Sequence, residues 1–100
     1  MNEPALSPDQ AKEIVATKTA PRVTENGIKD KIASVDYLHH GQLTIAIITM
    51  SNGFMVHGVS APASPENFDP EVGKRYAFEN AFRQLWQLEG YLLREKLAFG

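Results

Sequence analysis

The stretch Leu43–Ser60, which reads LTIAIITMSNGFMVHGVS, decides the fold. Apolar residues occupy both faces of an extended chain over 43–50, a pattern typical of a central strand that is covered on both sides. Asn52-Gly53 is a strong hairpin signal, and we expect a type I′ turn there, in which both residues have positive φ. Residues 54–60 alternate and return as a strand. The stretch therefore predicts an antiparallel hairpin.

Upstream of this hairpin, residues 35–39 alternate in the same way and are separated from it by the turn His40-Gly41-Gln42. They predict a third strand and a meander in sequence order. Thr24 is a suitable cap for a short helix over 25–33, and Ser7-Pro8 is a suitable start for another that runs to about Thr17. Because Pro21 ends the linker after that first helix, we expect residues 1–21 to form an appendage and residues 22–100 to form one domain.

Downstream of the hairpin, residues 61–68 predict a loop and Asp69-Pro70 a helix start, with aspartate as the N-cap and proline at the first position. Apolar residues then recur at helical spacing to about Leu97. The expected fold class is α+β: a three-stranded antiparallel meander packed with one long C-terminal helix and short N-terminal helices.

The expected helix is too long for the expected sheet. About 28 helical residues extend about 42 Å, whereas three strands are only about 15 Å wide. The far part of the helix is nevertheless apolar, with Trp86, Leu92, Leu97 and Phe99 among its residues. We therefore expect this surface to pack on another copy of the chain, giving a homo-oligomer.

Composition narrows the function classes. The 100 residues include ten Lys or Arg against twelve Asp or Glu, for a net charge of −2, and no cysteine. An acidic chain is a poor binder of duplex nucleic acid, and the absence of cysteine removes thiolate metal sites and cysteine nucleophiles. The longest apolar run, near 45–48, is too short to span a membrane, and the N-terminus lacks a secretory signal pattern. We expect neither duplex nucleic acid nor a membrane as partner.

Catalytic and metal-binding patterns are weak. His39 and His40 are adjacent in a predicted strand, so they point to opposite faces and cannot chelate one ion. A nucleophile set of Ser60, His57 and Asp36 can be assembled on paper, but no nucleophile elbow surrounds the serine. Phosphate-loop and dinucleotide fingerprints are absent. We expect no enzyme activity, no catalytic residue, no metal and no cofactor.

The start of the long helix is the best candidate for a binding site. A helix N-terminus offers unpaired N–H groups to an anion, and Phe68 beside it could stack on a base. The simpler interpretation is that Asp69 is only the cap and Phe68 only core. Further along, a polar stripe at helical spacing carries Arg83 and Arg94, which are either a solvated face or the lining of a cleft between subunits.

Four strings, in this order, resemble one known family: Asn52-Gly53-Phe54, Asn67-Phe68-Asp69, Glu79-Asn80-Ala81 and the stretch Leu85–Leu93, which reads LWQLEGYLL. The chain is similar, over about residues 22–98, to a family of small tailed-phage proteins, long of uncharacterised function, that includes the anti-Thoeris signal sponges. Those sponges bind a cyclic ADP-ribose isomer without degrading it, some also take up cyclic oligonucleotides at a second site, and the known ones are hexamers.

The resemblance implies a bacteriophage anti-defence protein that sequesters a cyclic nucleotide in the host cytoplasm as a homo-oligomer, by the family's pattern a hexamer. It implies a base stacked on Phe68, a ribose or base edge bonded to Asn80, and phosphates bonded to Arg83 and Arg94. The remaining candidate ligand-binding residues lie beside these: Asn67, Lys74 and Arg75. The alternative is a non-enzymatic structural or protein-interaction module of the phage, and a third possibility is a small hydrolase.

Overall fold

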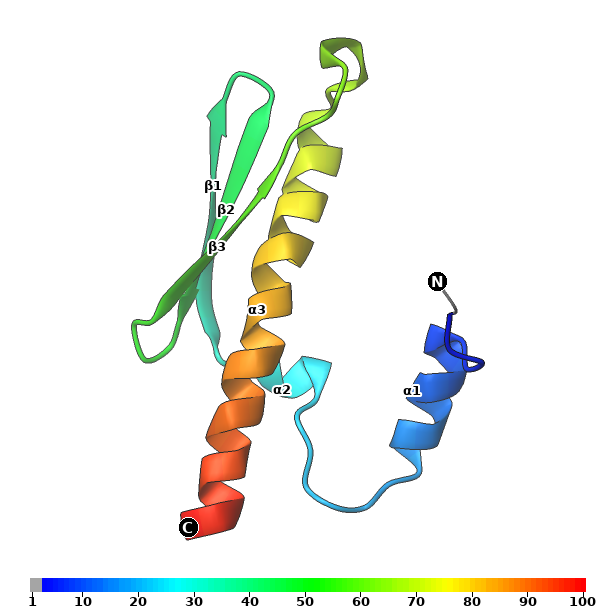
Figure 1. Ribbon diagram of the computed structural model, residues 1–100. Helices are drawn as coiled ribbons and strands as arrows, with labels where there is room; N and C mark the ends of the chain where they lie inside the picture. The colour runs from blue at the N-terminus through cyan, green and yellow to red at the C-terminus, as the bar shows by residue number, and fades with distance from the viewer. Residues whose placement is uncertain (1–2) are drawn as a thin grey trace.

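The computed structural model describes residues 3–100. Its elements in chain order are helices α1 (Pro8–Ala16) and α2 (Glu25–Asp30), strands β1 (Ile32–His40), β2 (Leu43–Met50) and β3 (Met55–Ser60), the short 3₁₀ turn η1 (Pro65–Asn67) and helix α3 (Pro70–Phe99). The strands form one antiparallel sheet in the order β1-β2-β3. Figure 1 shows α3 lying along one face of this sheet and continuing past its lower end. The predicted α+β fold is confirmed.

The turn between β2 and β3 differs from the type I′ turn that the sequence predicts. Only Gly53 has a positive φ, 90°, whereas Asn52 does not. The Gly53 N–H donates to the Met50 carbonyl oxygen at 2.9 Å, and the Met50 N–H donates to the Phe54 carbonyl oxygen at 2.7 Å. This is a three-residue loop that ends in a left-handed glycine. Asn52 instead uses its side-chain oxygen to accept the Phe54 N–H at 2.9 Å.

The junction of α2 and β1 also differs from the prediction. Helix α2 ends at Asp30, three residues early, and β1 begins at Ile32 instead of residue 35. Ile32 pairs with Met50, and the Ser51 N–H donates to the Lys31 carbonyl oxygen at 2.7 Å. Sheet pairing with the end of β2 therefore replaces the last expected turn of the helix, as tertiary contacts commonly do with short helices.

The core lies between α3 and the sheet. From α3 it takes Gly73, Ala77, Ala81, Phe82 and Leu85, and from the remaining elements Ile28, Thr44, Ala46, Ile48, Met50 and Val56. Close contact depends on Gly58 in β3, because a Cβ atom there would overlap the Ala77 carbonyl oxygen and the Ala81 nitrogen. Small residues thus allow α3 to lie directly against β3.

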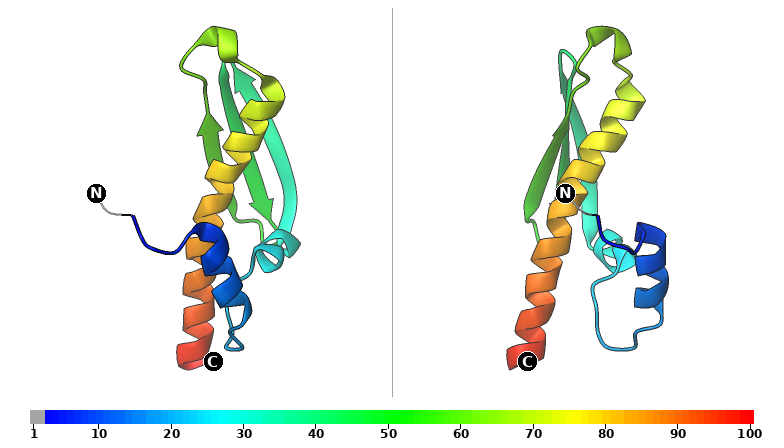
Figure 2. Two further views of the ribbon diagram at one scale, coloured as in Figure 1. Left: turned by 90° about the vertical axis from the view of Figure 1, so that its right-hand side faces the viewer. Right: turned by 45° about the vertical axis from the view of Figure 1, so that its right-hand side comes forward.

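Only one face of the sheet is covered, so the expectation of a strand covered on both sides is wrong for a single chain. Along β2, buried and half-buried residues alternate, and the half-buried ones are Leu43, Ile45, Ile47 and Thr49. The views in Figures 1 and 2 show why: α1, α2 and α3 all lie on the same side of the sheet. Nothing in residues 3–100 covers the opposite face, which we call the open face.

The two ends of the chain contribute little to this core. Helix α1 has the predicted capping box, in which Ser7 and Gln10 exchange hydrogen bonds, but it buries no residue and stands apart in Figure 2. After Leu85, α3 buries no further residue, and Leu97 and Phe99 are 58% and 83% exposed. Over residues 3–100, none of the helices has the length and hydropathy of a membrane span.

Candidate functional site

The start of α3 forms a small cup of about 230 Å³, to which Asn67, Phe68 and Tyr76 contribute. Phe68 is half-buried. A Cβ atom added at Gly73 would come within 3.9 Å of its ring, so Phe68 packs against the first turn of α3. The ring therefore contributes to packing and still keeps part of its surface open to the cup.

The N-terminus of α3 is already occupied by a carboxylate. Asp69 Oδ1 accepts the Glu71 N–H at 2.9 Å and the Val72 N–H at 3.2 Å. These are two of the N–H groups that a phosphate would need, and the negative charge opposes a second anion. Asp69 is thus the cap that the simpler interpretation expects, and it occupies the N–H groups that an anion would need.

Asn80 has a structural partner. Its Oδ1 accepts the Val59 N–H at 3.0 Å, and one turn later the Gln84 side-chain N–H donates to the His57 carbonyl oxygen at 2.5 Å. Both bonds are made to backbone groups on the outer edge of β3, which would otherwise be unpaired. The Asn80 side chain covers this edge, and among the described residues its amide NH₂ group has no hydrogen-bond partner.

A groove of about 300 Å³ between α2 and α3 is lined by both cationic side chains and aromatic rings. Lys29, Arg75 and Arg83 line it together with Glu25 and Glu79, and its apolar wall consists of Phe78, Phe82 and Trp86. Phe82 lies 5.6 Å from Phe78 and 6.4 Å from Trp86 between ring centroids, the latter pair edge to face. We call it the α2–α3 groove.

The charges in this groove are only partly paired. The Arg75 Nε and the Glu79 Oε1 are 3.1 Å apart, in an ion pair one helical turn long. Among the residues that the structure describes, no ion pair involves Lys29 or Arg83. An anion entering the groove would therefore meet two unpaired cations beside exposed aromatic surface. The sequence analysis does not predict the groove as a unit. The spacing of Phe78, Phe82 and Trp86 by four residues, however, indicates that the three rings lie on one face of the helix.

The other two predicted site residues lie apart from both places. The Lys74 ammonium is 5.8 Å from the centroid of the Tyr37 ring and 3.5 Å from Glu71. Arg94 is 24 residues beyond Pro70, or about 36 Å along the helix. A single chain thus brings together Asn67 with Phe68, and Arg75 with Arg83, but it does not bring either pair to Arg94.

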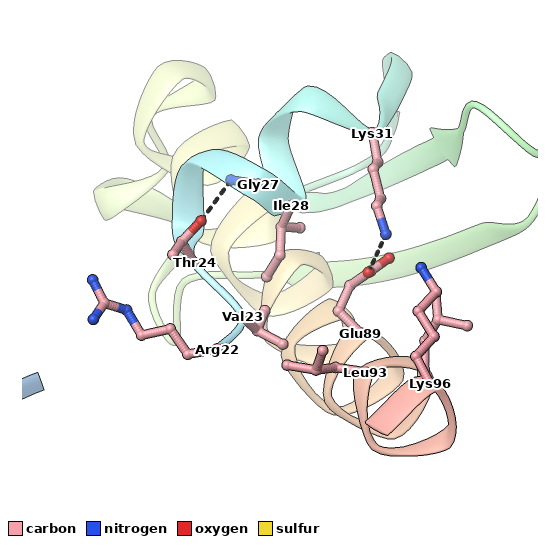
Figure 3. A pocket seen from close by; sticks show the side chains of 10 residues that line it. Arg22, Val23, Thr24, Gly27, Ile28, Lys31, Glu89, Leu93 and Lys96 are labelled. Atoms are coloured by element: carbon pink, nitrogen blue, oxygen red, sulfur yellow. Dashed lines mark hydrogen bonds and ion pairs between the residues drawn. The ribbon is translucent and has the colours of Figure 1, made fainter. Parts of the chain in front are cut away.

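A second cleft on the other side of α2, of about 170 Å³, has a structural explanation. Figure 3 shows Lys31 reaching across to Glu89, with the Lys31 Nζ 2.5 Å from the Glu89 Oε2. Val23, Ile28 and Leu93 lie beside this pair. The cleft marks where α2 is fixed to the middle of α3. Because Lys31 and Glu89 are 58 positions apart, no local pattern predicts their contact.

Within residues 3–100 there is no group of three or more His, Cys, Asp or Glu side chains that could hold a metal ion. The His39 ring lies 3.3 Å from the Thr44 hydroxyl at the top of the covered face. His57 is exposed on the open face, as the alternation of β3 requires. These histidines therefore lie on opposite faces of the sheet.

These features define a small α+β protein in which one long helix carries both the packing face and the candidate binding surfaces. The sequence model of the phage protein (N4 Gp49/phage Sf6 gene 66) family matches residues 23–97, three quarters of the chain, and the protein belongs to this bacteriophage family. No curated protein and no solved structure matches the chain. The match begins where α2 is about to start, so it leaves out α1.

Proposed function

We propose that this protein is a phage counter-defence sponge, which binds a cyclic nucleotide immune signal and holds it without degrading it. Membership of the phage family supports the biological setting. The observation that carries the chemistry is the α2–α3 groove, where Lys29 and Arg83 lie unpaired next to three aromatic rings. The ligand class is a cyclic ADP-ribose isomer or a cyclic oligonucleotide, encountered in the host cytoplasm.

The groove supplies the two interactions that such a ligand needs. A planar base stacks on an aromatic face, which is worth about 1–3 kcal/mol per base. The Arg83 guanidinium can make two parallel charge-assisted bonds to a phosphate, which are stronger than bonds between neutral groups. No covalent step is required, so the ligand leaves the site unchanged.

In this proposal a second chain brings together two candidate contacts that lie outside the α2–α3 groove. Phe68 and Arg94 stand at opposite ends of α3, about 36 Å apart along the helix, which is too far for one small ligand. Two copies with antiparallel α3 helices would bring Phe68 of one copy towards Arg94 of the other. The exposed apolar end of α3 provides surface for such assembly. We therefore propose a homo-oligomer, with a hexamer as the expected state.

The test separates binding from turnover. The protein is mixed with a purified cyclic ADP-ribose isomer and, in a parallel sample, with a cyclic dinucleotide, and the protein is removed by filtration. The retained fraction is then heated, and both fractions are assayed for intact ligand. A sponge depletes the filtrate and releases intact ligand on heating. Release of a hydrolysed product, or a filtrate as rich in ligand as a protein-free control, contradicts the proposal.

The second candidate is a structural or protein-interaction module of the phage, and the exposed C-terminal part of α3 favours it. Trp86, Leu88, Leu92 and Leu97 are all exposed there. For this function the apolar surface serves assembly alone, and the α2–α3 groove takes no ligand. The filtration experiment distinguishes the two, because a module of this kind leaves both nucleotides in the filtrate.

A further inference from the structure

The open face of the sheet is an apolar surface that nothing in residues 3–100 covers. Its strands contribute Leu38, Leu43, Ile45, Ile47, Met55 and Val59. Leu38, Met55 and Val59 are 53%, 56% and 47% exposed, which is unusual for three large apolar residues on one sheet face. A half-covered antiparallel sheet normally carries polar residues on its outer face, so this pattern indicates a partner.

Polar residues also lie on this face: Ser34, Thr49 and His40 near its two ends, and Asp36 and His57 together in one central row. Asp36 of β1 pairs with Ile47 of β2, which pairs with His57 of β3. Asp36 and His57 therefore lie on either side of Ile47, about 10 Å apart across two strand spacings. Within the described chain neither the Asp36 carboxylate nor the His57 ring has a hydrogen-bond partner. Each is a polar group available to a facing surface.

We propose that the open face binds the open face of a second copy of this chain, about a two-fold axis that runs along β2. This rotation places β1 of one copy over β3 of the other. Asp36 of each copy then faces His57 of the other, so the contact occurs twice in the pair, and in each the imidazole N–H donates to the carboxylate. In the next row Leu38 faces Val59 and Ile45 faces its own counterpart, so the wholly apolar row of one copy meets the same row of the other.

The charges select this axis over the alternative. A two-fold axis perpendicular to the strands would place Asp36 over Asp36 and His57 over His57, which leaves the carboxylates opposed. Both axes keep the strands of the two sheets aligned, as facing sheets commonly are, so the row of Asp36 and His57 decides between them. An unrelated protein partner would need a matching row of its own, whereas this chain already carries both halves. A second copy is therefore the occupant that the surface fits.

The size of the face indicates how this contact works. Three strands about 14 Å wide and eight residues about 27 Å long give a projected area of about 400 Å². A stable dimer commonly buries about 800 Å² on each partner. The sheet contact is thus one of two contacts in an assembly, and the exposed part of α3 provides the other. The sheet contact specifies one interface of the proposed self-association and does not depend on the ligand.

Charge reversal tests the proposal directly. Asp36→Arg and His57→Glu are each compared with the parent by sedimentation equilibrium, and each is expected to weaken the affected association step at least tenfold. The double variant Asp36→Arg/His57→Glu restores opposite charges across the axis and is expected to return within about threefold of the parent. An equimolar mixture of the two single variants is expected to recover association as well, and because no copy then carries both substitutions, this recovery reports contact between copies. Glu66→Arg, on η1, is the matched control for the change in charge.

Each outcome has a distinct meaning. Single variants that associate like the parent, or a double variant that is no better than the single ones, overturn the sheet contact and leave self-association through α3 intact. A parent that stays monomeric overturns both. Circular dichroism of each variant checks that the exposed substitutions leave the fold unchanged. The filtration experiment with nucleotide remains an independent test of the sponge.

Discussion

The two halves of α3 differ in how much of their apolar surface is buried. The first half, Pro70 to Leu85, places a glycine, two alanines, Phe82 and Leu85 against the sheet and buries all of them. The second half carries more large apolar residues than the first but buries none, and Trp86, Leu88 and Leu97 are exposed. The first half thus determines how one chain folds. The second half contacts α2 through Glu89 and Leu93 but leaves most of its apolar surface exposed, and the proposed contacts between copies would cover that surface.

The largest effect is expected where α3 touches β3. Gly58→Val would place side-chain atoms on the Ala77 carbonyl oxygen and the Ala81 nitrogen, which are backbone atoms and cannot rotate away. We expect the free energy of unfolding to fall by about 3 kcal/mol or more, enough to unfold a marginally stable domain. Urea denaturation followed by circular dichroism measures this.

Gly90→Ala in the second half is the matched control for Gly58→Val. No atom lies within 4 Å of an added Cβ there. Replacing a helical glycine by alanine should stabilise the protein by about 0.5–1 kcal/mol. A Gly58→Val protein as stable as the parent would show that α3 does not lie against β3.

Leu85 and Leu88, about one helical turn apart, test the difference in burial between the two halves of α3. Leu85 is 1% exposed, and Leu85→Ala should cost about 2–5 kcal/mol of unfolding free energy through the cavity it leaves. Leu88 is exposed, and Leu88→Ala should cost about 1 kcal/mol or less in a dilute single chain. The same Leu88→Ala variant should weaken self-association in sedimentation equilibrium. Equal losses of stability from both variants would contradict the difference in burial between the two halves.

The proposed ligand contacts are tested by replacing Arg83, Phe68 and Arg94 one at a time. Arg83→Ala should weaken cyclic nucleotide binding by about ten- to a hundredfold, and Phe68→Leu by a similar or smaller factor, because leucine keeps apolar volume without a stacking face. Titration calorimetry measures both, with Phe68→Ala as the comparison for lost packing. Arg94→Ala weakens binding only if the site closes between two chains. Normal binding by all three variants with oligomeric state preserved would move the site elsewhere.

The smallest expected effect concerns the ion pairs along α3. Glu89→Gln breaks the contact with Lys31 that fixes α2, and because Lys31 is 43% exposed we expect a cost of only about 1 kcal/mol. Glu79→Gln breaks a more exposed pair with Arg75 within one helix and should cost about 0.3–0.5 kcal/mol. Thermal denaturation at low ionic strength distinguishes the two. A larger effect from Glu79→Gln would contradict the role of Lys31 and Glu89 in fixing α2.

The elements of this fold could be predicted from the sequence because each carries a local signal. The caps at Ser7, Thr24 and Asp69 were identified correctly, and β2 has the predicted bounds. The predictions fail where contacts between residues far apart in the sequence, or a side-chain hydrogen bond, determine the local structure. Pairing with Met50 shortens α2, and the Asn52 side chain bonds the Phe54 N–H in a turn that differs from the expected one.

The candidate site was less predictable than the fold. The sequence indicates Arg75 by its place one turn after the helix start and Arg83 by its place on the polar stripe, but the groove they share with Lys29 depends on how α2 crosses α3. Asn80 was chosen as a ligand contact, and its bond to Val59 depends on the distance from α3 to the edge of β3. Residues on one helix are predictable neighbours, whereas contacts between elements require the packed structure.

The mass of the protein in solution tests the central claim most directly, because the second half of α3 and the open face are both explained by contact between copies. Light scattering at micromolar concentration is expected to give a whole-number multiple of 11.1 kDa, at least two copies and by the proposed function six. A mass of 11.1 kDa at that concentration would contradict the account, because both apolar surfaces would then face water without a partner.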